Sequence, residues 1–409
     1  MDGFSGPERV TLPLWRSGAI GAPPRRWVAH SAHGTIAVPH RSIRPWSRNR
    51  EELRLISSST PQSPSHVVLD GSRGEGGGQI LRTALTLSLL TGQSFRMVKI
   101  RANRDKPGLR PQHQKAVQAA VELGHASVAG GGVGARELIF WPKPYEARDL
   151  SIDIGTAGST GLLLQTLHLP MALRTDVPMR LALAGGTFNP MAPPFSFLDA
   201  TWRAYMAAFG VPLTLSMSAA GFYPRGGGRL EATIEPATLR PFVQTDRGPL
   251  RRLHGIAGVA NLADDVARRM RDHAVERLRE LGIDAEIELA RWASPGQGAA
   301  ISLTAEHDGT VPATFVGLGK RGKPAETVAD EAVAELLAYE AVENAAVDPH
   351  SADQILLPLA FAPGRSEFTV SAITEHLRTN AETIRAFLDR SITIVEPTGD
   401  GEPGRILVE

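Results

Sequence analysis

Cysteine is missing from this sequence of 409 residues. Its absence excludes disulfides, zinc ribbons, iron–sulfur clusters and a thiol nucleophile, so catalysis would need another nucleophile. An excess of either charge is also missing, because 44 Lys and Arg face 43 Asp and Glu and leave a net charge of +1. Affinity for a polyanion must therefore come from local clusters of basic residues.

Long apolar runs are absent as well. None approaches the roughly 20 residues that a membrane-spanning helix needs, and the N-terminus lacks the pattern of a secretory signal. We therefore expect a soluble, cytoplasmic protein without membrane contact. The chain is 42% hydrophobic and 21% charged, which is typical of globular proteins, and its length predicts more than one domain. The sequence leaves the oligomeric state open.

Residues 1–64 differ in composition from the remainder. They hold eight prolines, nine arginines, no lysine and four acidic residues, without a sustained apolar period. We interpret this segment as a mobile Pro/Arg-rich extension outside the fold. An arginine-rich transit peptide or a misassigned start codon would explain the same composition.

Strand-like and helix-like segments alternate from His66 onward, which predicts an α/β or α+β fold. A strand, a glycine-rich turn and a helix follow one another in three places, at residues 66–90, 151–169 and 181–210, so the pattern indicates structural repeats. The pattern of predicted helices and strands changes near Gly248. A long amphipathic helix (262–281), strand-like segments and a further helix (325–340) predict an inserted helix-on-sheet unit there.

Two glycine-rich motifs fit familiar nucleotide-binding patterns only in part. GLGKRGK (317–323) has the spacing of a phosphate-binding loop, but Pro324 stands where the magnesium-binding Ser or Thr belongs. GGGVGA (130–135) is followed by a strand-like segment and not by the helix that would hold a pyrophosphate, which favours a hairpin turn. We reject both as nucleotide sites.

Two other segments are better candidates for an anion site. GSRGEGGGQILR (71–82) combines five glycines with Glu75 and Arg82 at the start of a helix, which suits an anion beside a metal-binding carboxylate. Residues 96–115 hold seven Lys or Arg and the single acid Asp105. Because aromatic residues are missing there, phosphate contacts are favoured over base stacking, with a solvated charged surface as the alternative.

His376 falls at the edge of the apolar stripe of a predicted helix over 374–389. Ile373, Leu377, Ile384 and Phe387 form that stripe, so the imidazole should be half-buried. A lone histidine in such a place is more often structural than catalytic.

Several motifs together resemble the RNA 3'-terminal phosphate cyclase family. They are RGEGGGQILR, IRANRDKPGLRPQHQKAV, GTAGSTGLLLQT, AGGTFNPMAPP, GFYPRGGG, ADQILLPLA and the downstream His376, and they cover the chain from about His66 to its end. The resemblance implies a large domain of three repeated α/β units (65–246 and 344–409) with an inserted small α/β domain (247–343). It also implies an ATP-dependent ligase that forms a phosphoric ester bond.

The family's reaction implies specific roles. His376 would take AMP from ATP and pass it to an RNA 3'-phosphate, and the 2'-hydroxyl would then displace AMP to leave a 2',3'-cyclic phosphate. An imidazole is a suitable nucleophile because it is largely uncharged near neutral pH. Glu75 would hold Mg2+ or Mn2+ on the triphosphate. The ATP pocket would be lined by Gln165, Pro193, Pro194, His350, Ser351, Ala352, Asp353 and Gln354. The RNA phosphate or the triphosphate would be bound by Arg82, Arg101, Arg104, Gln112 and His113.

One departure and two alternatives accompany this interpretation. His350 and Ser351 stand where the family often has an aromatic residue followed by a large aliphatic one, which leaves the shape of the adenine pocket open. Cyclase-like proteins of this fold that act in ribosome assembly lack the nucleophile, so the presence of His376, Glu75 and the arginines favours an enzyme. The second alternative is an enolpyruvyl transferase, whose repeated α/β units are similar. It would use the basic run for a phosphorylated metabolite and would need no adenylated histidine.

Overall fold

The structure, a computed structural model, describes residues 66–74, 77–144 and 148–409. The predicted extension of residues 1–64 and the predicted metal ligand Glu75 lie outside these ranges. Within them, the strands form four sheets of four strands each. No helix of the described ranges is both long and apolar enough to cross a membrane.

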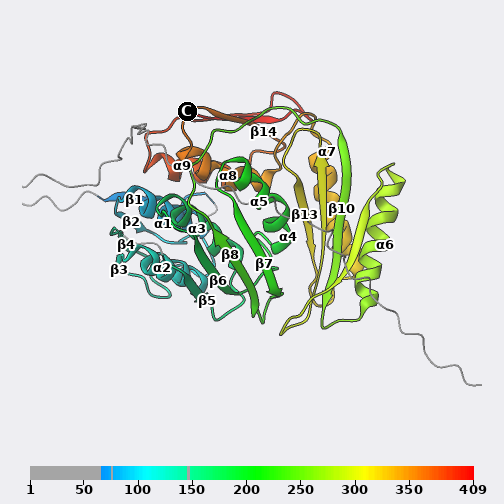
Figure 1. The fold of residues 1–409 in the computed structure, drawn as a ribbon, viewed down its shortest axis with the longest axis horizontal. Coiled ribbons are helices and arrows are strands. Elements are labelled where there is room, and N and C mark those ends of the chain that lie inside the picture. The colour runs from blue at the N-terminus through cyan, green and yellow to red at the C-terminus, as the bar shows by residue number, and fades with distance from the viewer. Residues whose placement is uncertain (1–65, 75–76, 145–147) are drawn as a thin grey trace, which may run out of the picture. The chain divides into compact units, whose positions relative to one another are not determined.

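The first unit consists of a small mixed sheet and two helices (Figure 1). Its elements are β1 (Val67–Asp70), α1 (Gln79–Thr91), β2 (Phe95–Val98), α2 (Pro111–Gly124), β3 (Ser127–Ala129) and β4 (Leu138–Trp141). The sheet order is β1-β2-β4-β3, with β1 parallel to β2 and the other pairs antiparallel. The antiparallel pairing of β3 with β4 confirms the hairpin predicted at GGGVGA. Helix α1 is almost entirely buried because apolar residues cover most of its circumference.

The second unit repeats this topology. Its elements are β5 (Leu150–Asp153), α3 (Thr160–Leu173), β6 (Met179–Gly185), α4 (Phe195–Phe197), the π-helical turn η2 (Leu198–Trp202), α5 (Arg203–Ala208), β7 (Leu213–Ala219) and β8 (Gly228–Ile234). The sheet order is β5-β6-β8-β7. The prediction that residues 181–210 open a third unit was wrong, because β6 pairs in parallel with β5 in the same sheet.

The third unit is interrupted along the chain. It comprises β9 (Val243–Gln244), α8 (Pro349–Phe361), β14 (Ser366–Val370), α9 (Glu375–Arg385), β15 (Ile392–Val395) and β16 (Gly404–Val408). Its order, β9-β14-β16-β15, matches the other two units, with β9 parallel to β14. The insertion falls between β9 and α8. The α/β fold with three repeated units and an inserted unit is therefore confirmed.

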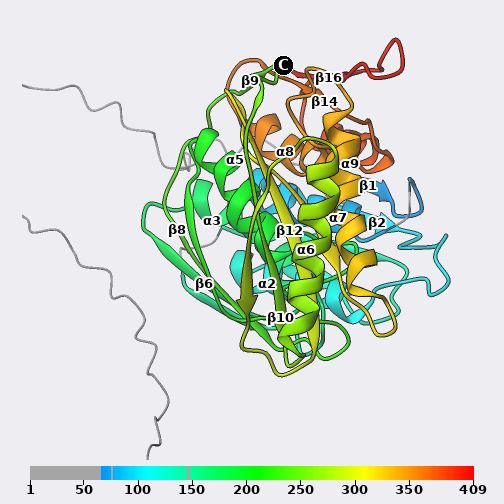
Figure 2. The same ribbon diagram turned by 90° about the vertical axis from the view of Figure 1, so that its right-hand side faces the viewer.

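The inserted unit is a sheet covered by two helices. It contains β10 (Leu250–Ala260), α6 (Asp264–Glu280), β11 (Glu286–Arg291), β12 (Gly298–His307), β13 (Ala313–Leu318) and α7 (Ala325–Glu340). Figure 2 shows α6 and α7 lying over one face of this sheet. Apolar residues of both helices and of the sheet form a hydrophobic cluster of their own. On the other face, buried Thr201 of η2 donates a hydrogen bond of 2.9 Å to Thr314 of β13. The boundaries 247 and 343 remain a proposal.

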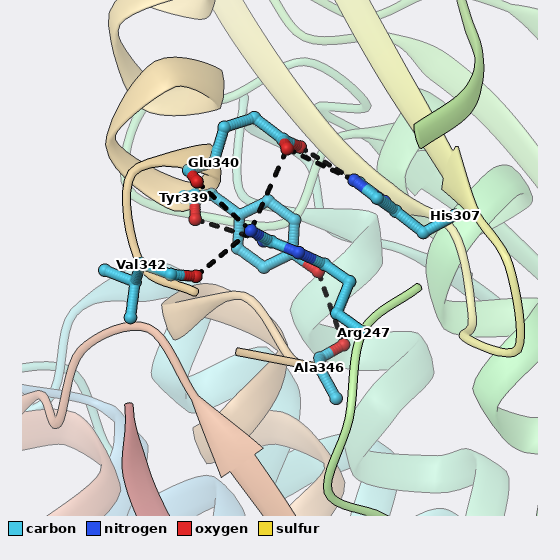
Figure 3. A network of polar contacts seen from close by, with 6 residues as sticks. All are labelled: Arg247, His307, Tyr339, Glu340, Val342 and Ala346. Carbon is cyan, nitrogen blue, oxygen red and sulfur yellow. Dashed lines mark hydrogen bonds and ion pairs between the residues drawn. The ribbon is translucent and has the colours of Figure 1, made fainter. Parts of the chain in front are cut away.

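Arg247 connects the segment that leads from β9 into the inserted unit with the segment that leads out of it after α7 (Figure 3). Its side chain is 6% exposed and donates to the carbonyl oxygens of Tyr339, Glu340 and Val342 at 3.0–3.2 Å. The guanidinium also lies 4.2 Å from the centroid of the Tyr339 ring. The Glu340 carboxylate faces Arg247 at 3.8 Å and the His307 ring at 3.0 Å. One buried cation thus satisfies the last carbonyls of α7.

Candidate active site

His376 lies in the first turn of α9. Thr374 caps this helix, because its hydroxyl accepts a hydrogen bond of 3.1 Å from the Leu377 N–H. Leu377 and Ile384 are fully buried, whereas His376 is only partly buried. The predicted half-buried position of His376 is confirmed.

Gln79, the first residue of α1, fixes the orientation of the His376 ring. Its amide nitrogen donates to the backbone carbonyl of His376 at 3.2 Å and to Oδ2 of Asp353 at 2.8 Å. A backbone carbonyl only accepts, so the amide oxygen is the atom that faces Nδ1 of His376 at 3.0 Å. That oxygen cannot donate, so Nδ1 carries the proton. In the neutral ring, Nε2 is then the nitrogen with the available lone pair.

Asp353 on α8 completes this polar group. Burial is the main cause that raises the pKa of its carboxyl to about 7, and the positive charges of His350 and Arg82 oppose the shift. Asn380 of α9 donates to the backbone carbonyl of Asp353 at 2.6 Å and accepts from the Thr83 hydroxyl at 2.8 Å. Helices α1, α8 and α9 are therefore held together by side-chain hydrogen bonds around His376.

Arg82 and His113 meet at the glycine-rich start of α1. A Cβ added at Gly78 would clash with the His113 ring and lie 2.7 Å from Nη1 of Arg82, so no side chain fits at residue 78. Burial lowers the pKa of Arg82 to about 10. Burial, followed by the charges of Arg82, Arg101 and Arg110, lowers the pKa of His113 to about 3. The His113 ring is therefore neutral at physiological pH, and its Nδ1 accepts the Arg110 N–H at 3.1 Å.

Arg101 and Arg104 add two more positive charges beside this pair. Arg101 donates to the carbonyl oxygens of Lys106 and Gly108 at 2.9 and 3.2 Å. Burial, together with the charges of Arg110 and Arg104, lowers the pKa of Arg101. A Cβ at Gly77 would lie 3.6 Å from Nη2 of Arg104. Cations held this close to one another stabilise a bound polyanion.

Three helices direct their N-termini at this place. Gly78 at the start of α1 contacts His113 in the first turn of α2, and Gln79 contacts His376 in the first turn of α9. Helix N-termini attract anions through free N–H groups and the helix dipole. Gln112 lies at the same end of α2. It lines a small recess with Arg82, His113 and Ser159, the residue that caps α3. The site therefore combines a nucleophile with a strongly anion-binding surface.

The residues predicted to bind ATP lie on α3, on α8 and in the loop before α4. Gln165 of α3 donates to the side-chain oxygen of Gln354, whose own amide donates to the His350 carbonyl at 2.6 Å. Ser351 and Ala352 are fully buried, whereas Asp353 and Gln354 are partly exposed. The exposed His350 faces Glu335 at 3.7 Å, and this carboxylate is the main cause that raises its pKa.

Pro193 and Pro194 lie at the N-terminal end of α3 and at the start of α4. A Cβ added at Gly161 would lie 2.5 Å from the Pro193 carbonyl, so the loop packs directly on the first turn of α3. Pro194 is the residue that precedes α4. The residues predicted to bind ATP thus come from the two helices that carry Gln165 and Gln354 and from a loop packed on one of them.

Two residues of the site were given no role by the sequence. Gln79 was part of the quoted motif GGGQILR, but its partners Asp353 and His376 are 274 and 297 residues away. Asn380 is one turn beyond His376 on the same helix, which is the only local signal for it. No group of three or more His, Asp or Glu that could hold a metal is present in the described part of the chain.

Comparisons with known proteins agree with the resemblance. The family model described as RNA 3'-terminal phosphate cyclase matches residues 73–394. A protein of that name from Ralstonia nicotianae is 44% identical over 80% of this chain and 93% of its own length. Those from Caldivirga maquilingensis and Pyrococcus abyssi are 41% and 39% identical, over 80% and 84% of this chain and 94% and 98% of their own length.

Proposed function

This chain belongs to the RNA 3'-terminal phosphate cyclase family, and on that premise we propose that it uses ATP to convert an RNA 3'-terminal phosphate into a 2',3'-cyclic phosphate. The observation that carries the proposal is the pairing of an oriented histidine, His376, with the adjoining group of Arg82, Arg101, Arg104 and His113. A nucleophile beside a polyanion site is what nucleotidyl transfer requires.

The first step forms a covalent histidine adduct. Nε2 of His376 attacks the α-phosphorus of ATP, the bond from that phosphorus to the bridging oxygen breaks, and diphosphate leaves. Gln79 keeps the proton on Nδ1, so Nε2 is the nitrogen whose lone pair can attack the phosphate. Asp353 in turn holds the Gln79 amide. We assign Gln165, Pro193, Pro194, His350 and Gln354 to the ATP pocket, with Ser351 and Ala352 supporting its wall.

The next two steps transfer AMP and close the ring. An oxygen of the RNA 3'-phosphate attacks the adenylate phosphorus and the N–P bond breaks, which gives RNA(3')pp(5')A. The 2'-hydroxyl then attacks the RNA phosphorus and loses its proton to solvent, the bond from that phosphorus to the bridging oxygen breaks, AMP leaves and the cyclic phosphate remains. Arg101 and Arg104 bind the terminal phosphate as fixed cations. His113 is neutral with Nδ1 accepting a hydrogen bond, so its Nε2–H is available as a donor to a phosphate oxygen.

A divalent metal ion would suit this site. Mg2+ is usually held by one or two carboxylates together with substrate phosphates, so a single carboxylate such as Glu75 is a sufficient protein ligand. Mn2+ accepts the same oxygen ligands. When bound, the ion would screen the charge of the triphosphate.

The proposal is tested by following a 3'-phosphorylated oligoribonucleotide with the purified protein, ATP and Mg2+. We expect conversion to a phosphatase-resistant cyclic end, with one AMP and one diphosphate released per end. Arg101→Ala should raise the KM for RNA while the protein stays folded. No ATP-dependent conversion by the folded wild type would leave a cyclase-like assembly factor as the better reading.

A further inference from the structure

Two surface loops that carry motifs without a role lie side by side. The turn between β7 and β8 holds all but the last glycine of GFYPRGGG (221–228), and the loop between β13 and α7 holds the basic residues of GLGKRGK. Residues 298 and 299 connect them: a Cβ at Gly298 would clash with the Phe222 ring, and the Gly319 N–H donates to the Ala299 carbonyl at 2.9 Å. In Figure 1, β7 and β8 lie beside the sheet edge that β13 forms.

The side chains of these loops are exposed and of one charge. Tyr223 is 72% exposed, and Arg225, Lys320 and Arg321 are also exposed. Among the described residues, these three cations make no ion pair. Lys323 in the same loop differs, because Glu331 and the Leu318 carbonyl hold its ammonium group at 2.7 and 2.8 Å. The loops therefore present one aromatic ring and three uncompensated cations to solvent.

This surface adjoins the active site through the loop that precedes α3. A Cβ at Gly226 would lie 2.8 Å from the Cα of Ala157, and one at Gly158 would lie 3.0 Å from the Cβ of Gln112. The next residue, Ser159, lines the recess with Arg82 and His113. At 3.8 Å per residue, this path from Tyr223 to Ser159 is at most about 25 Å long. A few nucleotides of single-stranded RNA can span that distance.

We propose that Tyr223, Arg225, Lys320 and Arg321 bind the single-stranded RNA just 5' of the terminal phosphate. The inference rests on the proposed function and extends its substrate site. An aromatic ring stacks on any base, and cations beside it follow the phosphates without reading sequence. The basic run of residues 96–115 has no aromatic side chain, so Tyr223 supplies the stacking surface that the terminal-phosphate site lacks.

The test compares two substrates with the full-length protein. One is a 3'-phosphorylated oligoribonucleotide of about ten nucleotides, and the other is a dinucleotide 3'-phosphate, too short to reach the surface. Tyr223→Ala should raise the ratio of the KM for the long RNA to the KM for the short one by about tenfold, the usual effect of losing one stacked base. Tyr223→Phe keeps the ring and should retain the wild-type ratio.

The charges are tested by the salt dependence of kcat/KM for the long RNA. Replacing Lys320 and Arg321 together by alanine should reduce the slope of log kcat/KM against log salt concentration by about 1.4, since each phosphate contact on a single strand contributes about 0.7. Arg279→Ala is the matched control, because Arg279 is an exposed arginine on α6, on the other side of the inserted sheet. Arg279→Ala should change neither the KM ratio nor the slope of the salt dependence.

The outcomes separate the two proposals. If the wild type cyclises both RNAs but Tyr223→Ala leaves the KM ratio unchanged, or Arg279→Ala lowers the slope as much as the double variant, this inference is wrong and the proposed function stands. If the wild type cyclises neither RNA with ATP, the proposed function fails and the inference fails with it.

Discussion

Gln79 is the residue on which the geometry of His376 depends. Its amide has one orientation that satisfies the His376 carbonyl, and that orientation places the amide oxygen against Nδ1. Histidines that act as nucleophiles or ligands need such a partner, because the hydrogen bond on one ring nitrogen decides the state of the other.

Replacing Gln79 should therefore slow adenylation of His376 without unfolding the protein. In Gln79→Ala the His376 ring can take either tautomer and can rotate. We expect the rate of adenylation to fall about 10- to 100-fold, which is typical of the loss of an orienting partner. Gln79→Glu keeps an acceptor for Nδ1–H, but its negative charge favours the protonated imidazole. The pH profile of adenylation should move to higher pH in that variant. Wild-type rates for Gln79→Ala would contradict the role given to this residue.

His113, which is buried, and Asp353, which is partly buried, are titratable groups with opposite effects on stability. The pKa of His113 is about 3 in the folded protein and 6.5 ordinarily, so between these values the unfolded chain binds more protons and stability rises with pH. The pKa of Asp353 is about 7 in place of 3.8, so the folded chain binds more protons and stability falls as pH rises. The two effects oppose each other between about pH 4 and 6.5.

Single substitutions should separate these effects in thermal unfolding. Relative to the wild type, His113→Asn should make Tm rise less steeply with pH across this window, and Asp353→Asn should make it rise more steeply. Curves of Tm against pH that stay parallel for the three proteins would show that neither group titrates as its burial implies.

At the scale of elements, the site depends on where helices begin. The first turns of α1, α2 and α9 meet, and each supplies a side chain that the proposed mechanism uses. The cap of α9 matters most, because Thr374 fixes the turn that carries His376.

Thr374→Ala should lower the free energy of unfolding by about 1 kcal/mol, the usual cost of losing an N-cap hydroxyl. Thr374→Ser keeps the hydroxyl and should stay close to the wild type. Urea denaturation measures both. A loss as large in the serine variant as in the alanine variant would mean that packing of the Thr374 methyl group, and not the cap, holds this turn.

Element boundaries were predictable where strong local signals exist. The helix at 325–340 was predicted with its observed ends, because Pro324 precedes an uninterrupted helical pattern. The assignment of β6 to a new repeat was wrong because a strand, a glycine-rich turn and a helix look alike locally, whereas sheet membership is decided by pairing with β5 about thirty residues earlier. The role of Gln79 could not be predicted from the local sequence. Its partners Asp353 and His376 lie in the third unit, 274 and 297 residues away.

In the whole molecule, the chain enters and leaves the inserted unit through two segments, and Arg247 holds these segments together. The sequence indicated an insertion because the pattern of predicted helices and strands changes near Gly248. It gave no sign that the preceding arginine would be buried, because its partners are backbone carbonyls at the far end of the insertion.

Arg247→Ala should lower the free energy of unfolding by about 3–5 kcal/mol, since it leaves the Glu340 carboxylate and three carbonyl oxygens without their buried cation. Arg251→Ala is the control. Arg251 is 68% exposed and pairs with Asp308 at 3.2 Å, so its loss should cost less than about 1 kcal/mol. Chemical denaturation of both variants tests this, and equal losses would contradict the role of Arg247 as the buried connection.

The proposed mechanism depends on His376 as the nucleophile that accepts AMP. The most direct measurement is incubation of the wild type and His376→Ala with ATP labelled on the α-phosphate and Mg2+, followed by a denaturing gel. We predict a covalent label on the wild type that is acid-labile and alkali-stable, as a phosphoramidate should be, and no label on the variant. A folded wild type that takes no label, or a variant that is labelled equally, would contradict His376 as the nucleophile.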